Sequence, residues 1–418
     1  MRRRTTRLGA LTVVSGLLLA ACGGDDAATG DGGSGDTQEI TMWMYPVIFD
    51  EADHSAFWDE QVAAFEADNP DIAVKVEIYP WANRDEALGT ALAGGTAPDV
   101  VYLIPDQIPQ YAHTLAPVDE YLDDTALAAY RPNAVESVSM DGQLLGAPIL
   151  MSINPLVCNK AAFDDVGADY PESWDDLLAL APSFKDAGYD VTNYWGSVDA
   201  TLNTSFYPLL WQAGGDVFTD DGSAVAFNSP AGVAALSLLV ELADGGYVER
   251  DLLTTIPAFE QTNTAKGQIG CTWQQVPADL EPFWGEENIV VLPPLRQRES
   301  IAYGTVGALS IMADPGDAAA DAAGRWVSYV SSEAVTSEYV VASGYFSPYA
   351  LDDSLYADDT RYAEMETHLD AATAGTPHEH ARQVMGLLAP EIQAALTGQK
   401  TPEAALADAE NAAANLFD

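Results

Sequence analysis

The chain has 418 residues, of which 48% are hydrophobic, and it carries 64 acidic against 17 basic side chains for a formal net charge of −47. A chain of this length and apolar content can bury a large core, and its length is typical of two or three domains. The shortage of lysine and arginine argues against nucleic-acid binding, because phosphate contacts need clustered basic residues, and it disfavours a polyanionic ligand.

The N-terminus has the pattern of a secretory signal. Four arginines among the first seven residues precede the apolar run 8–22, which is too short to cross a bilayer as an ordinary transmembrane helix. The run ends in Leu19-Ala20-Ala21-Cys22, which resembles the bacterial lipobox. We therefore expect a signal peptide over 1–21 and a lipid on Cys22 that tethers the mature protein to the membrane. An ordinary cleaved signal with a chance cysteine is the alternative.

The first third of the chain predicts alternating strands and helices. Residues 22–38 are expected to form the lipidated cysteine and a disordered linker, because 23–38 hold no apolar residue larger than alanine. The elements expected after the linker are a strand over 40–45, a helix over 53–68, a strand over 74–78, a helix over 85–93 and a strand over 100–104. This order is typical of an α/β lobe with a largely parallel sheet.

The rest of the chain continues in the same style. The expected strands cover 155–160, 268–273, 288–292 and 306–312, the expected helices cover 173–187, 203–213 and 230–244, and the chain is mainly helical from 317 onward. Ser229-Pro230 and Thr401-Pro402 each place a hydroxyl cap before a proline at the start of a helix. The sequence therefore predicts a two-lobed α/β protein that holds its ligand between the lobes.

Motifs of catalysis are missing from the sequence. It has no G-x-S-x-G, no H-E-x-x-H, no P-loop and no G-x-G-x-x-G after a strand. His378 and His380 are two residues apart and would not share a helix face, so we expect a structural or solvated role for them and no metal site. The sequence predicts a protein that is not an enzyme and uses no cofactor.

Aromatic residues gather at the ends of the expected strands. The chain has nine tryptophans and eighteen tyrosines, and those at or just past strand ends include Trp43, Tyr45, Trp81, Trp273, Tyr303 and Tyr345. Aromatic rings can lie flat against the C–H faces of sugars, while Asp, Asn and Gln side chains bond to the hydroxyl edges. Core packing is the alternative for any one ring, but their collective placement favours a carbohydrate site.

Cys158 and Cys271 remain if Cys22 carries lipid. An oxidising compartment permits a disulfide between them. Two buried free thiols are the alternative, because a free cysteine behaves as a small hydrophobe. The residues themselves leave both readings open.

Several longer motifs follow one another in a fixed order. They are FEADNP at 65–70, ALAGGTAPDVVYL at 91–103, GQLLGAPI at 142–149, PESWDDLLALA at 171–181 and LLWQAGGDVFTDDG at 209–222. On these segments the mature chain resembles the extracellular solute-binding proteins of ABC importers, and within them the sugar-binding family that includes maltose-binding protein.

The resemblance implies a fold and a mechanism. The fold would be the type II periplasmic-binding-protein fold, with an N-terminal lobe of 39–155 plus 300–345 and a C-terminal lobe of 156–299 plus 346–418. A sugar or oligosaccharide would enter the cleft between hinge-linked lobes and favour their closure. The protein would be a monomer, lipid-anchored at the extracellular face of the cytoplasmic membrane, that delivers its ligand to ABC permease subunits.

The resemblance also implies ligand contacts. Trp43, Trp81 and Trp273 would stack on sugar rings, Asp106 would accept hydroxyl hydrogens, and Gln107 and Asn203 would fix the orientation of the ligand. The other expected ligand-binding residues are Tyr45, Tyr207, Gln274, Tyr303 and Tyr345. Cys158 departs from the tyrosine of the family's Y-N-K motif and Cys271 from its Gly-Pro-Trp motif. Both cysteines would fall in strands of the second lobe, which strengthens the disulfide reading.

Three alternatives stay open at this point, the first within the same class of binding protein and the other two in different classes. An aromatic, acid-rich cleft would also bind a cationic solute such as a polyamine through cation–π contacts. A secreted carbohydrate-active lipoprotein enzyme is the second alternative. An adhesin or structural lipoprotein without a small ligand is the third.

Overall fold

The structure is a computed structural model that describes residues 37–81, 84–312 and 317–417. The expected signal peptide, Cys22 and most of the expected linker lie outside the described residues. Within the described ranges, no helix combines the length and the apolar character that a membrane span requires.

The first sheet has the strand order β2-β1-β3-β13-β4, and β7 also pairs with β13. Its strands are β1 (Gln38–Met44), β2 (Ile72–Ile78), β3 (Val100–Leu103), β4 (Leu115–Ala116), β7 (Ala147–Met151) and β13 (Val306–Met312). β1 pairs in parallel with both β2 and β3, whereas β13 runs antiparallel to β3. The predicted alternation of strands and helices is confirmed for β1 to β3, which pair in parallel. The prediction of a largely parallel sheet is wrong for the sheet as a whole, because β13 pairs antiparallel with β3, β4 and β7.

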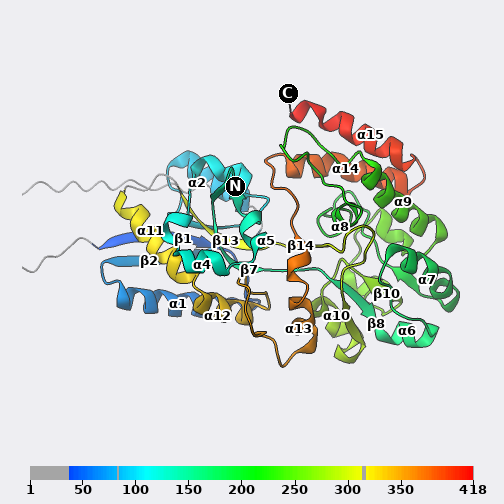
Figure 1. The fold of residues 1–418 in the computed structure, drawn as a ribbon, viewed down its shortest axis with the longest axis horizontal. Helices are drawn as coiled ribbons and strands as arrows, with labels where there is room; N and C mark the ends of the chain where they lie inside the picture. Colours follow the sequence, from blue (N-terminus) through cyan, green and yellow to red (C-terminus); the bar gives the residue numbers. More distant parts are fainter. Residues whose placement is uncertain (1–36, 82–83, 313–316, 418) are drawn as a thin grey trace, which may run out of the picture. The chain divides into compact units, whose positions relative to one another are not determined.

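Helices cover this sheet. They are α1 (Glu51–Asp68), α2 (Arg84–Gly94), α11 (Asp317–Val330) and α12 (Glu333–Ser343) (Figure 1). α1 begins two residues before the predicted start because the Asp50 side chain accepts hydrogen bonds from the backbone N–H groups of Ala52 and Asp53. The fully buried side chains of Trp58 and Trp326 pack in the core of this part of the chain.

The second sheet has the order β11-β8-β10-β9. Its strands are β8 (Leu156–Asn159), β9 (Asp190–Thr192), β10 (Ile269–Thr272) and β11 (Ile289–Leu292). The helices of this part of the chain are α6 (Lys160–Val166), α7 (Trp174–Ala187), α8 (Tyr207–Gln212), α9 (Pro230–Gly245), α10 (Pro277–Trp284), α14 (Ala381–Leu396) and α15 (Pro402–Ala413). Antiparallel pairing of β10 with β8 sets Cys271 opposite Cys158, and the two are joined by a disulfide bond.

Capping residues decide where these helices begin. The predicted caps Ser229 and Thr401 accept hydrogen bonds from backbone N–H groups at the starts of α9 and α15. The helix predicted over 203–213 is shorter than expected. α8 begins only at Tyr207, because Pro208 lacks an N–H and is best accommodated in the first turn.

The remaining elements are short. They are α3 (Ile108–Tyr111), α4 (Asp124–Ala129), α5 (Pro132–Ser137), α13 (Thr360–Glu366), β5 (Ser139–Met140), β6 (Gln143–Leu144), β12 (Ala302–Tyr303) and β14 (Ala372–Thr373).

Two sheets with their covering helices form two lobes. One hydrophobic cluster surrounds the first sheet and extends to α10 and to side chains of the second sheet, namely Val157, Ile269, Leu280, Trp284, Ile289 and Val291. The other cluster lies between the second sheet and helices α7, α9, α14 and α15. We call these parts the first lobe and the second lobe. The first cluster also takes in Phe346, Met365 and Leu369, which follow the predicted lobe boundary at residue 345. The two-lobed α/β fold is confirmed, while the lobe boundaries stay a prediction.

Three segments connect the lobes: one follows β7, one precedes β13 and one follows β14. Hydrogen bonds tie them together, because the Ser152 N–H donates to the Thr305 carbonyl at 2.9 Å and the Gly304 N–H donates to the Thr373 carbonyl at 2.9 Å. A Cβ atom on Gly304 would lie 2.3 Å from the Ser152 carbonyl oxygen, so this close approach requires glycine. We call residues 152–154, 303–305 and 372–373 the hinge ribbon.

Candidate functional site

A large hollow lies beside the hinge ribbon and has a volume of about 700 Å³. This volume falls within the usual range of small-molecule sites. Five of its lining residues are aromatic, namely Phe49, Tyr303, Tyr345, Phe346 and Tyr362. Its polar lining includes Asn154 of the hinge ribbon and Asp279 at the start of α10. We call it the aromatic hollow.

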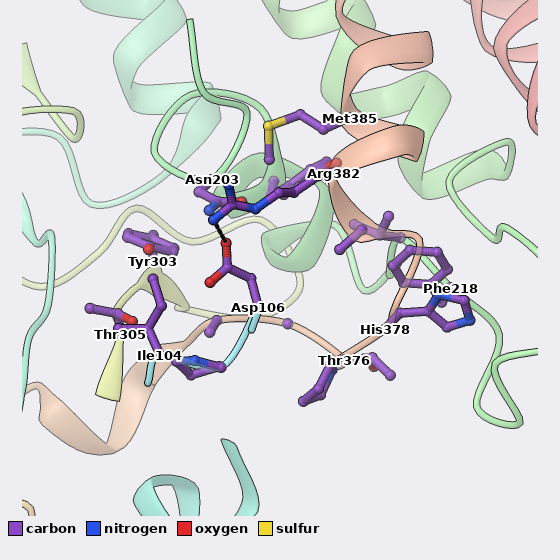
Figure 2. A pocket seen from close by; sticks show the side chains of 17 residues that line it. Ile104, Asp106, Asn203, Phe218, Tyr303, Thr305, Thr376, His378, Arg382 and Met385 are labelled. Atoms are coloured by element: carbon purple, nitrogen blue, oxygen red, sulfur yellow. Dashed lines mark hydrogen bonds and ion pairs between the residues drawn. The ribbon is translucent and has the colours of Figure 1, made fainter. Parts of the chain in front are cut away.

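A second hollow shares Tyr303 and Thr305 with the aromatic hollow. Its other lining residues come from both lobes and include Ile104, Asp106, Asn203, Tyr207, Phe218, Arg382 and Met385. Figure 2 shows the Asp106 carboxylate facing Arg382, with Asn203 and Tyr303 beside them. We call it the polar hollow. Together the two hollows place aromatic rings and hydrogen-bonding groups around the hinge ribbon.

Tyrosine hydroxyls in the two hollows are held in the protonated form. Burial, and after it the nearby Asp106 carboxylate, raise the pKa of Tyr303 to about 12. Burial also raises the pKa of Tyr345 and of Tyr207 above the ordinary tyrosine value. Like ordinary tyrosines, these groups are protonated at neutral pH and can donate a hydrogen bond to a neutral ligand.

Two buried polar atoms of the polar hollow have no hydrogen-bond partner within the described part of the chain. They are Oδ1 of Asp106 and the hydroxyl oxygen of Tyr207. Buried polar atoms are normally hydrogen-bonded. Two buried polar atoms without partners in a hollow are therefore consistent with a site that binds polar groups of a ligand.

Asp106 is one end of an ion-pair bridge. Arg382 Nη2 lies 2.9 Å from Asp106 Oδ2, and Arg382 Nη1 lies 3.0 Å from Asp85 Oδ2. The amide of Gln107 is fully buried and donates to Asp85 Oδ1 at 2.5 Å. Gln107 thus orients a carboxylate of the bridge and does not line either hollow.

The structure brings five of the predicted contact residues to the hollows: Asp106, Asn203, Tyr207, Tyr303 and Tyr345.

Trp43 does not line either hollow, since it is buried against Tyr79 and its Nε1–H donates to Glu77 at 2.9 Å. Trp273 is also buried, and its Nε1–H donates to the Ser205 carbonyl at 3.1 Å. The Gln274 side-chain oxygen accepts a hydrogen bond from the backbone N–H of Trp195 at 3.1 Å. The stacking predicted for Trp43 and Trp273 has no counterpart in either hollow, because neighbouring side chains already cover these rings.

Tyr45 and Trp81 do not line the aromatic hollow, but Trp81 contacts a loop that does. Their rings stack with centroids 5.0 Å apart, and the Trp81 Nε1–H donates to the Pro46 carbonyl at 2.6 Å. Pro46 begins the loop 46–49, which lines the aromatic hollow and ends in the fully exposed Phe49. These two rings therefore hold a wall of the hollow in place.

The sequence alone did not point to Phe49, Tyr362 or Arg382. Phe49 is a large apolar residue just before the capping Asp50, and Arg382 is one of only 17 basic residues in an acidic chain. These features were the available signals. Neither one indicates a position beside the hinge ribbon.

His54 contacts the loop 46–49 from the interior of the protein. It is fully buried, its Nδ1 accepts a hydrogen bond from the Ile48 N–H at 3.3 Å, and burial lowers its pKa from the ordinary 6.5 to about 4. A lowered pKa in the folded state means that the stability contributed by the neutral ring is present above about pH 6.5 and is lost as the pH falls toward 4.

We therefore expect replacement of His54 by glutamine to change the response of stability to acid. The amide oxygen can still accept the Ile48 N–H, but the side chain does not titrate. Thermal unfolding followed between pH 7.5 and pH 4.5 should show a smaller loss of melting temperature in His54→Gln than in the wild type. Equal losses would contradict a role for His54, because the surface carboxylates are the same in both proteins.

The His378-Glu379-His380 segment has a packing role. The His378 ring stacks on Phe218 with centroids 4.1 Å apart, and its Nε2 lies 2.9 Å from the Gly222 carbonyl oxygen. Among the described residues, no group of three histidine, cysteine, aspartate or glutamate side chains is gathered to hold a metal ion.

Two hinge-linked α/β lobes with hollows beside the hinge define a class, that of two-lobed binding proteins. The chain belongs to the family of bacterial extracellular solute-binding proteins, whose model matches residues 50–336.

Relatives and solved structures agree with this family. A protein of Brucella abortus named as a binding protein is 25% identical over 247 residues, which are 57% of this chain and 58% of that protein. The maltotriose-binding protein of Pyrococcus abyssi is 26% identical over 154 residues, which are 36% of this chain and 32% of that protein. This chain thus matches little more than half the length of the Brucella relative. The cyclic alpha-maltosyl-1,6-maltose binding protein of Arthrobacter globiformis has a similar fold, with a TM-score of 0.77 and 23% identity over 91% of this chain and 98% of that chain.

Proposed function

We propose that this protein captures a sugar or oligosaccharide between its two lobes and delivers it to the permease of an ABC transporter. The observation that carries this proposal is the aromatic hollow of about 700 Å³ beside the hinge ribbon. Phe49, Tyr345 and Tyr362 offer aromatic surface to the C–H faces of sugar rings. Asp106, Asn203 and Tyr207 of the adjoining polar hollow offer partners for hydroxyl groups.

The comparisons support a carbohydrate over other solutes. The names of the Pyrococcus and Arthrobacter proteins both specify oligosaccharides. In our proposal, ligand bridges the lobes and the extra contacts in the closed state favour closure. The protein acts by binding and release and does not turn its ligand over.

Calorimetric titration with a panel of neutral oligosaccharides tests this function. We expect saturable binding of at least one member, together with a smaller radius of gyration by X-ray scattering when that sugar is present. Chromogenic glycosides should show no turnover. Hydrolysis would indicate a carbohydrate-active enzyme, and a scattering curve that responds to no solute would indicate an adhesin or a structural lipoprotein.

A cationic solute is the second candidate, and one observation favours it. The aromatic hollow contains the Asp279 carboxylate among tyrosine and phenylalanine rings, an arrangement that suits an ammonium group through ionic and cation–π attraction. Titration with spermidine separates the two candidates. Binding of spermidine without binding of any sugar would replace the carbohydrate proposal.

We also propose that the mature protein is a monomer anchored by lipid on Cys22 at the extracellular face of the cytoplasmic membrane. The basic and apolar pattern of residues 1–22 supports the anchor. Labelling of the full chain with a radioactive fatty acid in a bacterial host should mark the wild type and leave Cys22→Ala unlabelled. Equal labelling of the two proteins would contradict lipidation of Cys22.

A further inference from the structure

Arg382 connects the two lobes through charge. It lies in the first turn of α14, the helix whose Val384 and Leu388 are buried in the second lobe. Its two carboxylate partners belong to the first lobe: Asp85 is in the first turn of α2, and Asp106 follows β3. One guanidinium group therefore links two carboxylates across the boundary between the lobes, and Figure 2 shows its contact with Asp106.

This bridge matters because the protein is strongly acidic. With a formal net charge of −47, closing one lobe on the other brings like charges together. A guanidinium group is suited to offset this repulsion, because its planar fork can bond two carboxylates at once and it stays charged at all physiological pH values.

The bridge also fixes one residue of the polar hollow. Arg382 bonds to Oδ2 of Asp106, while the buried Oδ1 of Asp106 has no partner within the described ranges. The carboxylate is thus held by one oxygen and leaves the other available in a hollow lined by Tyr207 and Asn203.

We infer that Arg382 is a positioning residue that holds the lobes together and orients Asp106 toward the ligand. The second part of this inference rests on the proposed function, whereas the first part does not. Arg382 makes the contact between the lobes itself and need not touch the ligand.

Ionic strength gives this bridge a signature that simple packing lacks. The Arg382 side chain is 51% exposed and each carboxylate is 27% exposed, so dissolved salt can screen the bridge. Closure should therefore respond to salt through Arg382 even when the ligand carries no charge. A packing contact would not produce this response.

X-ray scattering of the sugar-free protein tests the bridge directly. At about 20 mM NaCl, where charges act over about 20 Å, we expect a larger radius of gyration for Arg382→Gln than for the wild type. At about 1 M NaCl, where the screening length is about 3 Å, the difference should shrink. Arg382→Lys should fall between the two, because an ammonium group lacks the fork.

Arg325→Gln is the matched control. Arg325 pairs with Asp71 at 2.9 Å inside the first lobe, so its removal deletes one arginine without touching the contact between the lobes. We expect its radius of gyration to match that of the wild type at both salt concentrations. Equal radii for wild type and Arg382→Gln, or an equal change in Arg325→Gln, would overturn the bridge.

Titration with maltotriose tests the orienting role. We expect Arg382→Gln to bind about twofold to fivefold more weakly than the wild type at low salt, with this affinity ratio narrowing at high salt. If the ratio of the wild-type affinity to the Arg382→Gln affinity does not change with salt concentration, the role of Arg382 in orienting Asp106 is overturned. If maltotriose does not bind the wild type, the same comparison is made with the members of the oligosaccharide panel that do. If no member binds the wild type, the proposed function fails, and the scattering result still decides whether the bridge holds the lobes.

Discussion

Replacing Tyr303 by alanine will weaken sugar binding about thirty-fold or more, which corresponds to about 2 kcal/mol. Tyr303 lines both the aromatic and the polar hollow, and it lies in the hinge ribbon. Loss of its ring removes stacking surface from the aromatic hollow and part of the wall of the polar hollow. The hydroxyl is protonated at neutral pH, as in an ordinary tyrosine, and its pKa is raised further to about 12, so it can donate to the ligand in the wild type.

Two further variants separate the ring from other effects. Tyr303→Phe keeps the ring and loses one hydrogen bond, so we expect a loss of about 1 kcal/mol, or about fivefold in affinity. Tyr170→Ala removes a half-buried tyrosine that packs against Phe163 in the second lobe, and it should bind like the wild type. Melting temperatures show whether each variant is folded, and calorimetry gives the affinities. Wild-type affinity in folded Tyr303→Ala would exclude these hollows as the sugar site.

Local sequence signals were sufficient to predict most of the fold. Alternating apolar residues located β1 and β2, but not the short β4 or β7 of the same sheet, and Ser229-Pro230 located the start of α9. These features act within one or two turns of chain, so they can be read in order. The early start of α1 and the late start of α8 show the limit, because Asp50 and Pro208 set those boundaries through backbone bonding that apolar spacing does not report.

The site was less predictable because burial depends on residues far away in sequence. Trp43 and Tyr303 both sit at or near strand ends, yet Trp43 is covered by Tyr79 and bonded to Glu77, whereas Tyr303 remains at a hollow. The sequence shows that a ring is near a strand end but not which neighbour covers it. The contact between Arg382 and Asp106 spans 276 residues, and no local pattern predicts it.

The cysteines pose the same problem, since both readings of them were compatible with the sequence. The structure decides between them by pairing β8 with β10 and joining Cys158 to Cys271 across a separation of 113 residues. Both residues are fully buried in the second lobe. The bond therefore closes a long loop inside a central pair of strands.

We expect the double variant Cys158→Ala/Cys271→Ala to lose about 2–4 kcal/mol of unfolding free energy, because the disulfide restricts the unfolded chain and closes a long loop. Alanine is preferable to serine, since it buries no hydroxyl group without a partner. Denaturant unfolding under non-reducing conditions measures the loss. In the presence of a reductant, the wild type should approach the stability of the variant. Neither cysteine lines a hollow, so the folded variant should bind sugar with wild-type affinity. Equal unfolding free energies without reductant would show that the bond does not stabilise the second lobe.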